Sequence, residues 1–502
     1  EFLEKNNYIL APTATDNVFK QKFYLYTIFA KPTEKMCITF SKSGSDGATR
    51  RKSYIISTLM NLFENLKIID EDESEITLNQ VTTRSKALDY LSQNIYEYSK
   101  EGDSGIFKEL MATVMKNKEY SKVINLMFDG AFYSAKNPIL DENVARQLYG
   151  NKENIGITRL ERFAACAFAH FLQYGMKLTE RVEYEFKPMD MGNVMHEALE
   201  SFAEEVRKRG MKWTELTEQE RNEIADRCLD NIVADYGNTV LKSSARNEYM
   251  IERTRRILRR TVWALQKQLE QGEFQPEGFE VTFGGGRIDR VDIMEDQNKV
   301  YVKVIDYKTG NTSFDLVYLY HGLQLQLMIY LDGALRVEQK KYPDKEIIPA
   351  GVFYYNIKDP MIQEKIDADV EAVSAGLMKE LKMNGLVQAD PELVYRMDSS
   401  LGSIPVAFNK DGSFRKNSSV ADRTQFAVLG RYVRMKIEKI RSSILEGDAE
   451  VSPYELGKKN ACTYCPYMTV CGFDRRLSGY EFRRLKNFSD EELWKAFDRE
   501  AE

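Results

Sequence analysis

The sequence predicts an α/β or α+β fold for the region after about residue 150, and three observations carry this prediction. Residues 191–210, 252–270 and 322–338 show apolar residues at helical spacing. Three strand-like segments lie between the second and third of these helices, and a turn at 295–298 joins the last two as in a hairpin. A fourth strand is predicted at 349–357. Strands enclosed by helices indicate a layered arrangement around one sheet.

Length and composition indicate a globular protein. The chain has 502 residues, of which 43% are hydrophobic and 29% charged, and its net charge is −6. This length suits about two to four domains. The charge argues against a uniformly basic nucleic-acid-binding surface but leaves a local basic groove open. No apolar run approaches the roughly 18 residues of a membrane span, and no secretory signal peptide is recognised, so we expect a cytoplasmic protein.

Residues 1–150 read as a separate first region. The segment 22–41 is predicted to be a helix or strand, then a turn, then a β-rich strand, and 51–66 is predicted to be helical. Near residue 150 the pattern changes. Thr158 and Glu161 stand at capping-box spacing, which predicts that a new helix begins there.

The strand VKVIDYKTG, residues 302–310, ends in two charged residues. Side chains alternate along a strand, so Asp306 and Lys308 share one face with Val302 and Val304. An acid and an amine thus end an otherwise apolar row. Taken alone, a structural ion pair explains them as well as a catalytic site does.

Asp289, on the preceding strand, gives this pair a neighbour. Adjacent antiparallel strands lie under about 5 Å apart, so Asp289 and Asp306 can share a divalent ion such as Mg²⁺. Such an ion polarises a phosphoryl oxygen and acidifies a bound water. Lys308 can orient that water or balance developing charge, which suits phosphodiester hydrolysis. Asp292 falls on the opposite strand face and is predicted to be a salt-bridge residue.

Three other residues are ambiguous by themselves. A lone helical histidine such as His196 is usually structural, and Gln326 with Tyr330, one helical turn apart, would usually form a polar patch.

The triple glycine 284–286 precedes a strand, and we interpret it as a bend that lets nucleic acid approach. The chain has no G-x-x-x-x-G-K-S/T phosphate loop, so we do not expect it to hydrolyse ATP alone.

Taken in order, the segments GNVMHEALE, GGRIDRVD, VIDYKTG and LQLQLMIY resemble the motif set of RecB-type nucleases in the PD-(D/E)XK superfamily. The resemblance implies a restriction-endonuclease-like core with a central mixed sheet flanked by helices. It also implies the members of the catalytic site. These are His196, Asp289, Asp306 and the backbone carbonyl of Tyr307 around Mg²⁺ or Mn²⁺, Lys308 as the catalytic lysine, and Gln326 with Tyr330 as the terminal pair.

Six cysteines are too few for a disulfide scaffold, but four of them are candidate metal ligands. Three of these cluster as Cys-x2-Cys-x5-Cys, at Cys462, Cys465 and Cys471. That spacing fits zinc or iron–sulfur. A fourth ligand is still needed; Cys166 is the first candidate and His170 a competitor. Cys37 and Cys228 are predicted to be core residues.

Cysteines on both sides of the nuclease motifs also resemble those of iron–sulfur nucleases, in which all four hold a 4Fe–4S cluster. RLERFAACAFAHFLQYGMKL is similar to the segment with the first cluster ligand in the B subunits of AddAB (RexAB) helicase–nucleases. FYLYTIFAKPTEKMCITFS resembles the last helicase motif of UvrD/Rep-like proteins, with Lys31 where an active motor usually carries arginine. ATRRKSYIISTLMNLF resembles the segment that follows in the B subunits. The resemblance implies an inactive helicase-like portion at 1–150, a nuclease domain at 151–502, and a chain that is the C-terminal portion of a longer protein.

Arginines supply candidate DNA contacts despite the acidic total, although a solvated helix face explains the first group as well. Five are gathered in one predicted helix, at Arg253, Arg255, Arg256, Arg259 and Arg260. Four follow the last cysteine and are candidates for an exit groove, at Arg475, Arg476, Arg483 and Arg484. Phosphate contacts of this kind make binding salt-dependent. A nuclease without sequence choice needs little base readout.

The resemblance implies a Mg²⁺-dependent exonuclease that degrades single-stranded DNA, namely the 5′-ended strand, together with an A subunit during double-strand-break repair by homologous recombination. One alternative is a non-catalytic DNA-binding scaffold with a vestigial nuclease fold, which the intact Asp289, Asp306 and Lys308 disfavour. Another is a different iron–sulfur nuclease, such as a CRISPR adaptation nuclease or a replication helicase–nuclease; the helicase-like residues 1–66 disfavour the former. Structural zinc is the alternative for the cysteines.

Overall fold

A computed structural model describes most of the chain, which forms two compact units, Glu1–Phe132 and Tyr133–Glu502. The described residues are 12–44, 48–63, 65–70, 81–101, 105–134, 139–150, 155–181, 188–235, 244–284, 286–362 and 369–501. Gly285, in the middle of the predicted glycine bend, lies outside them. None of the helices described combines the length and apolarity needed to cross a bilayer.

The first unit is helical. Its helices are α2 (Ala14–Phe29), α3 (Tyr54–Leu62), α4 (Arg84–Glu101), α5 (Gly105–Met115), the 3-10 turn η2 (Lys118–Tyr120) and α6 (Ser121–Ala131). Thr13 and Asp16 form a capping box that begins α2. Leu91, Phe107 and Ile124 join α4, α5 and α6 in a small core. The assignment of residues 1–150 to a helicase-like region stays a prediction.

Two predictions for this unit are wrong. The β-rich segment that follows the turn after α2 forms no strand in its described residues, 35–41. A strand needs a neighbour to satisfy its backbone groups, and no partner strand lies beside this one among the described residues of the unit. Cys37 lies in this segment and is therefore exposed, not in a core.

The second unit is built on a six-stranded mixed sheet in the order β1-β2-β3-β4-β5-β6. The strands are β1 (Gln275–Phe283), β2 (Gly286–Asp296), β3 (Lys299–Lys308), β4 (Glu346–Asn356), β5 (Asn384–Gln388) and β6 (Val420–Ala421). β1, β2 and β3 form an antiparallel meander, and β4 pairs with β3 in parallel. β5 is antiparallel to β4, and β6 is parallel to β5. The predicted mixed sheet and the hairpin between β2 and β3 are confirmed.

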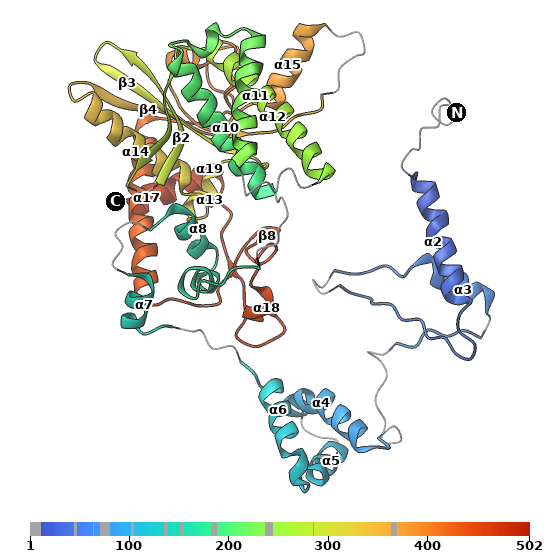
Figure 1. The fold of residues 1–502 in the computed structure, drawn as a ribbon. Helices are drawn as coiled ribbons and strands as arrows, with labels where there is room; N and C mark the ends of the chain where they lie inside the picture. The colour runs from blue at the N-terminus through green and yellow to red at the C-terminus, as the bar shows by residue number, and fades with distance from the viewer. Residues whose placement is uncertain are drawn as a thin grey trace, which may run out of the picture. The chain divides into compact units, whose positions relative to one another are not determined.

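Helices cover both faces of this sheet (Figure 1). One face packs on α10 (Pro188–Lys208), α11 (Glu218–Asp235) and α12 (Ala245–Glu270). The other face packs on α8 (Ile157–Ala165), α14 (Gln326–Lys341), α17 (Arg423–Leu445) and α19 (Asp490–Ala501). Sheet residues divide between the two cores by alternation, with Ile305 and Phe353 in the first core and Val304 and Val352 in the second.

Shorter elements complete this unit. They are α7 (Glu142–Tyr149), α9 (Ala167–His170), the π-helical turn η3 (Phe171–Gly175), η4 (Trp213–Glu215), α13 (Leu316–Tyr320), α15 (Val370–Glu380), α16 (Pro391–Met397) and α18 (Met468–Cys471). A three-stranded sheet of order β8-β7-β9 lies near the C-terminal end, with β7 (Tyr454–Leu456), β8 (Lys459–Asn460) and β9 (Arg483–Arg484).

The predicted capping box at the start of α8 is wrong. The helix begins at Ile157 after Gly156, without a side-chain cap. The Glu161 carboxylate instead accepts hydrogen bonds from the backbone N–H groups of Leu325 and Gln326, at 2.7 and 3.1 Å. The Glu161 carboxylate, which the sequence pattern assigned to capping of its own helix, is thus used in a contact with a different helix.

A buried charge cluster joins β2 to β3 on the sheet face that α10–α12 cover. Arg290 donates to both oxygens of Asp292, at 2.5 and 2.9 Å. The Lys303 ammonium lies 3.0 Å from Asp292, its direct partner across the strands. The Arg290 guanidinium also lies over the rings of Trp213 and Phe279. The predicted salt-bridge role of Asp292 is confirmed.

We expect Asp292→Ala to lower the free energy of unfolding by about 3–5 kcal/mol, because it leaves two buried cations without their partner. Urea denaturation measures this loss. Asp296→Ala, on the same strand, is the matched control; its carboxylate is 39% exposed, so the expected loss is under about 1 kcal/mol. Equal losses in the two variants would contradict a structural role for the buried cluster.

Candidate functional site

Two carboxylates meet where β2 begins and β3 ends. Arg290 pairs with Ile305 in the antiparallel register, so Asp289 lies one position further, opposite Asp306. Both side chains are buried. The Tyr307 N–H donates to Asp289 Oδ2 at 2.7 Å and holds this carboxylate at the strand end. The register thus brings together the two acids that the sequence predicted as neighbours.

A hydrogen-bonded row connects Asp306 to the start of α14. The Lys308 ammonium lies 2.6 Å from Asp306 Oδ2 and donates to Gln326 Oε1 at 2.8 Å. The Gln326 amide nitrogen donates to Asp306 Oδ1 at 2.8 Å and to the Tyr330 hydroxyl at 2.9 Å. Four predicted site residues therefore form one network, in which Gln326 fixes both the acid and the amine.

His196 reaches the same place from α10. Its Nδ1 lies 3.4 Å from Asp289 Oδ2. One ligand atom each from His196, Asp289 and Glu280 lie within 4.8 Å of one another, an arrangement that could hold a metal ion. Carboxylate oxygens and an imidazole nitrogen are suitable donors for a divalent cation.

Glu280 is a member of this group that the sequence did not predict. Its β1 neighbours Phe279 and Val281 pair with Arg290 and Ile288, so it lies opposite Asp289. Its backbone has φ 49°, a conformation that is uncommon for residues other than glycine. An acid between two apolar strand residues reads as a solvent-facing position, so the sequence carries no signal that separates Glu280 from an ordinary surface glutamate.

The crowded acids shift one another's protonation. Burial and the neighbouring Asp289 raise the pKa of Asp306 to about 7, against the lowering effect of Lys308. Burial and Asp289 likewise raise the pKa of Glu280 to about 7. Burial is the largest single effect on His196 and lowers its pKa, but the hydrogen bond to Asp289 and the negative charges of Asp289, Asp306 and Glu280 together raise the net pKa above its ordinary value. The site thus has an excess of negative charge that a cation would relieve.

Glu161, the second residue that sequence reasoning missed, anchors this network from α8. By accepting from the first N–H groups of α14 it holds the helix end that carries Gln326. Burial raises the pKa of Glu161 to about 7, with Asp306 adding to the rise, while the two backbone hydrogen bonds and Lys308 oppose it.

All four candidate cysteines line one small apolar pocket, the thiol pocket, and none of them is in a disulfide. They are Cys166, Cys462, Cys465 and Cys471. Burial raises the pKa of Cys462 to about 12, with the other three thiols adding to the rise. The pocket joins α9 to the C-terminal segment, where the Tyr467 hydroxyl donates to the Leu178 carbonyl at 3.0 Å and the Arg483 guanidinium donates to the carbonyl of Ala164.

His170, the competing ligand, lies in another environment. Its Nε2 accepts a hydrogen bond from Arg159 at 2.9 Å, and burial with Arg159 lowers its pKa to about 3. It is not one of the residues that line the thiol pocket. Cys228 is buried in the core beneath α10–α12, as predicted.

The candidate DNA-binding arginines differ in their surroundings. Arg255 and Arg259 are ion-paired with Asp226 of α11, and Arg260 lies over the Trp263 ring. Arg253 and Arg256 are exposed. Beyond the cysteines the arginines also have protein partners, namely Asp474 for Arg476, the Phe482 ring for Arg475, and Glu455 for Arg484. A role in DNA binding stays a prediction for all of them.

Comparison with known proteins gives one family and a set of close relatives. A family model described as the PD-(D/E)XK nuclease superfamily matches residues 154–472. The B subunit of the ATP-dependent helicase/deoxyribonuclease of Lachnoclostridium phytofermentans is 38% identical over 98% of this chain and 44% of its own length. Proteins of the same name from Alkaliphilus metalliredigens and Clostridium acetobutylicum are each 31% identical over 100% of this chain and 46% of their own length.

These matches confirm the resemblance to nuclease-bearing B subunits and the predicted PD-(D/E)XK fold. The chain spans slightly less than half the length of the curated relatives that it matches.

We expect Glu161→Gln to remove a loss in the free energy of unfolding that the parent chain shows as pH rises. In the folded chain the raised pKa keeps Glu161 protonated up to about 7, whereas the unfolded chain ionises near 4.5. Stability from this group is therefore lost as pH rises from about 4.5 through 7. Glutamine keeps the acceptor oxygen without the charge. The variant should match the parent below about pH 4 and exceed its free energy of unfolding by about 3 kcal/mol above about pH 8.

Urea denaturation across this pH range, in the presence of a chelator, measures the difference. Glu142→Gln, at an exposed site on α7, is the control and should change the free energy of unfolding by under about 1 kcal/mol throughout this range. A Glu161→Gln difference that does not change with pH would show that the carboxyl is not perturbed by its surroundings.

Proposed function

The chain belongs to the PD-(D/E)XK nuclease superfamily, and from that premise we propose that it hydrolyses single-stranded DNA as the nuclease part of a helicase–nuclease B subunit. The observation that carries the proposal is the convergence of Asp289, Asp306 and Lys308 at one end of the sheet. Each is held by a backbone or side-chain contact, which is how a preorganised site differs from a chance surface cluster.

The residues at this end of the sheet fit a divalent cation such as Mg²⁺ or Mn²⁺. We propose His196, Asp289, Asp306 and the Tyr307 carbonyl as its ligands, with Glu280 as a further acid beside them. The raised pKa values of Asp306 and Glu280 support this assignment, because burial and the neighbouring Asp289 disfavour their ionised forms even though Lys308 and Arg287 are ion-paired with them, and a bound cation would offset that effect. When bound, the cation supplies Lewis-acid polarisation of the phosphate and lowers the pKa of bound water.

The chain's own residues then position the reaction. Lys308 is fixed between Asp306 and Gln326, so its ammonium is placed to stabilise negative charge that develops on the phosphate or to orient the attacking water. Gln326 holds the lysine and the acid through one set of hydrogen bonds, and Tyr330 fixes Gln326 in turn. We assign Lys308 a catalytic role and Gln326 and Tyr330 positioning roles.

We propose that the thiol pocket holds a 4Fe–4S cluster. Four unpaired cysteines around one apolar pocket are a suitable donor set, since thiolates are the ligands of such clusters. Such a cluster would tie the segment at Cys166 to the segment that carries the other three cysteines, and so fasten the two ends of the nuclease domain. Zinc in the same pocket is the alternative.

For the whole protein we propose the role that the relatives' name describes. Since those relatives are B subunits, we propose that an A subunit accompanies this chain and that DNA is the substrate, in the cytoplasm. We propose further that residues 1–150 are a helicase-like remnant and that the nuclease degrades the 5′-ended strand during double-strand-break repair. Among the five arginines predicted to contact DNA from α12, we propose the two exposed ones, Arg253 and Arg256, as DNA contacts.

We expect Asp306→Asn to slow Mg²⁺-dependent hydrolysis of labelled single-stranded DNA by at least about a hundredfold, because it removes a charge at the reacting centre. A gel assay with the parent, with and without a chelator, measures the rate. Asp296→Asn is the matched control on β2 and should leave the rate unchanged. If Asp306→Asn digests DNA as fast as the parent, a non-catalytic scaffold is the better interpretation.

We expect the chain purified without oxygen to be brown and to contain about four irons. Cys465→Ser should lose most of this iron, because a hydroxyl is a poor substitute for a thiolate ligand. Cys37→Ser, at an exposed cysteine of the first unit, should keep it. Metal analysis of the three preparations decides the matter, and a colourless parent that contains zinc would refute the iron–sulfur assignment.

A further inference from the structure

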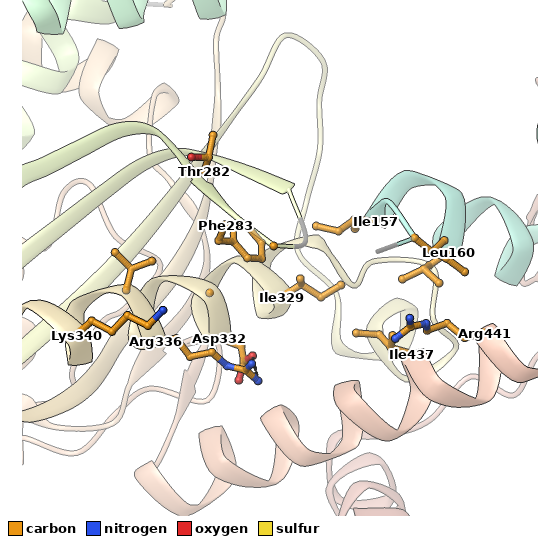
Figure 2. Close-up of a pocket in the computed structure, with 14 residues that line it drawn as sticks. Ile157, Leu160, Thr282, Phe283, Ile329, Asp332, Arg336, Lys340, Ile437 and Arg441 are labelled. Atoms are coloured by element: carbon orange, nitrogen blue, oxygen red, sulfur yellow. Dashed lines mark ion pairs between the residues drawn. The ribbon is translucent and has the colours of Figure 1, made fainter. Parts of the chain in front are cut away.

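A basic groove lies beside the proposed catalytic site and is lined by none of its residues. It has a volume of about 520 Å³ and lies between one face of α14, the end of β1, the start of α8, and α17 (Figure 2). Its α14 residues recur every three or four positions, which makes them one stripe of the helix. They include Ile329, Asp332, Gly333, Arg336 and Lys340.

The charge of this groove is opposite to that of the chain as a whole. Arg336 and Lys340 of α14 and Arg441 of α17 line it together with one acid, Asp332. Arg441 is also ion-paired with Glu438 of α17, at 3.0 Å. Asp332 is ion-paired with Arg336 at 2.8 Å and with Arg434 of α17 at 2.7 Å. Lys340 is exposed and makes no ion pair within the part of the chain that the structure describes. An anionic ligand is therefore favoured in a protein whose net charge is −6.

An aromatic ring stands between the groove and the catalytic site. Phe283, at the end of β1, lies against Gly333, where an added Cβ would come within 2.6 Å of the ring. Glycine inside a helix costs about 1 kcal/mol relative to alanine, so its presence here fits a requirement for this close approach. The ring also meets Tyr330 edge to face, with centroids 5.9 Å apart. The Gln326 amide nitrogen donates hydrogen bonds to the Tyr330 hydroxyl and to Asp306, so Tyr330 links the ring to the proposed catalytic site.

We propose that this groove binds the stretch of single-stranded DNA next to the phosphate that is cleaved. Arg336, Lys340 and Arg441 contact its phosphates, and a base stacks on the partly buried Phe283 ring. A cationic track combined with an aromatic platform is how proteins hold single strands without reading sequence. The inference rests on the proposed function and adds to it the path of the substrate, from the groove past Phe283 to Lys308.

Binding can be measured apart from hydrolysis. With the whole chain in a chelator, fluorescence anisotropy of a labelled oligothymidylate gives the affinity at several salt concentrations. In the double variant Arg336→Ala/Lys340→Ala we expect at least about a tenfold loss of affinity at low salt. We also expect the slope of log affinity against log salt to be shallower by about 1.4, because each phosphate contact to a single strand contributes about 0.7. Lys495→Ala, at an exposed lysine of α19, is the matched control and should bind like the parent.

The aromatic contact has a different signature. Phe283→Leu keeps an apolar side chain against Gly333 but removes the ring, and we expect it to weaken binding about fivefold or more without changing the salt slope. Phe283→Tyr, which keeps the ring, should restore the affinity. Thermal unfolding of each variant verifies that the fold is intact.

The outcomes separate this inference from the proposed function. If the double variant and Phe283→Leu both bind DNA with the affinity and salt slope of the parent, the proposed DNA-binding role of the groove is wrong, whatever the nuclease assay gives. A chain that binds no single-stranded DNA would overturn it too. If binding depends on the groove as expected but the parent does not cleave DNA with Mg²⁺, the groove stands and the proposed hydrolytic function fails.

Discussion

The antiparallel register of β2 and β3 is the constraint on which the candidate site depends. It places Asp289 opposite Asp306, and a slip of one residue would send one of them to the other face of the sheet. The opposite face fixes this register with charge as well as apolar packing, because Asp292 and Lys303 are direct cross-strand partners and are ion-paired at 3.0 Å. A wrong register would leave these buried charges unpaired, at a cost of several kcal/mol. The ion pair of Asp292 with Lys303 on one face of the sheet therefore helps to fix the register that places Asp289 opposite Asp306.

A second connection runs through α8, from the thiol pocket to the hydrogen-bonded network of Asp306, Lys308 and Gln326. Glu161 lies on this helix, and Cys166 follows directly after its last residue. α8 thus contacts the first N–H groups of α14 through Glu161, and its C-terminal end leads directly to Cys166 in the pocket. Because Gln326 is the first residue of α14 and holds both Asp306 and Lys308, whatever fastens Cys166 also restrains the proposed catalytic network. Cys166 is far from Asp306 in sequence, but the structure connects α8 to Asp306 through two contacts, Glu161 with Gln326 and Gln326 with Asp306.

Sequence alone could predict the parts of the site that obey a single local rule. Alternation along β3 put Asp306 and Lys308 on one face, and the same rule put Asp292 on the face opposite to Asp289. It could not predict Glu280, because its place depends on an irregular β1 with a register shift between Pro276 and Gly278. It misread Glu161, because the capping signature is the same whether the carboxylate serves its own helix or another one. The stripe of α14 that lines the groove likewise reads as a solvated helix face until α17 and Phe283 are in place.

The grouping of acids explains why this end of the sheet needs so much support. Asp289, Asp306, Glu280 and Glu161 lie close enough that Asp289 raises the pKa of two of the others and Asp306 that of Glu161. Carboxylates that repel one another in a buried place reduce stability, so they persist only where surrounding structure over-determines their positions. Here two packed faces, a backbone N–H to Asp289 and the Gln326 amide supply that rigidity. Many contacts therefore maintain a group of acids that reduces the stability of the fold, as is common at functional sites, and this agrees with the proposed cation site.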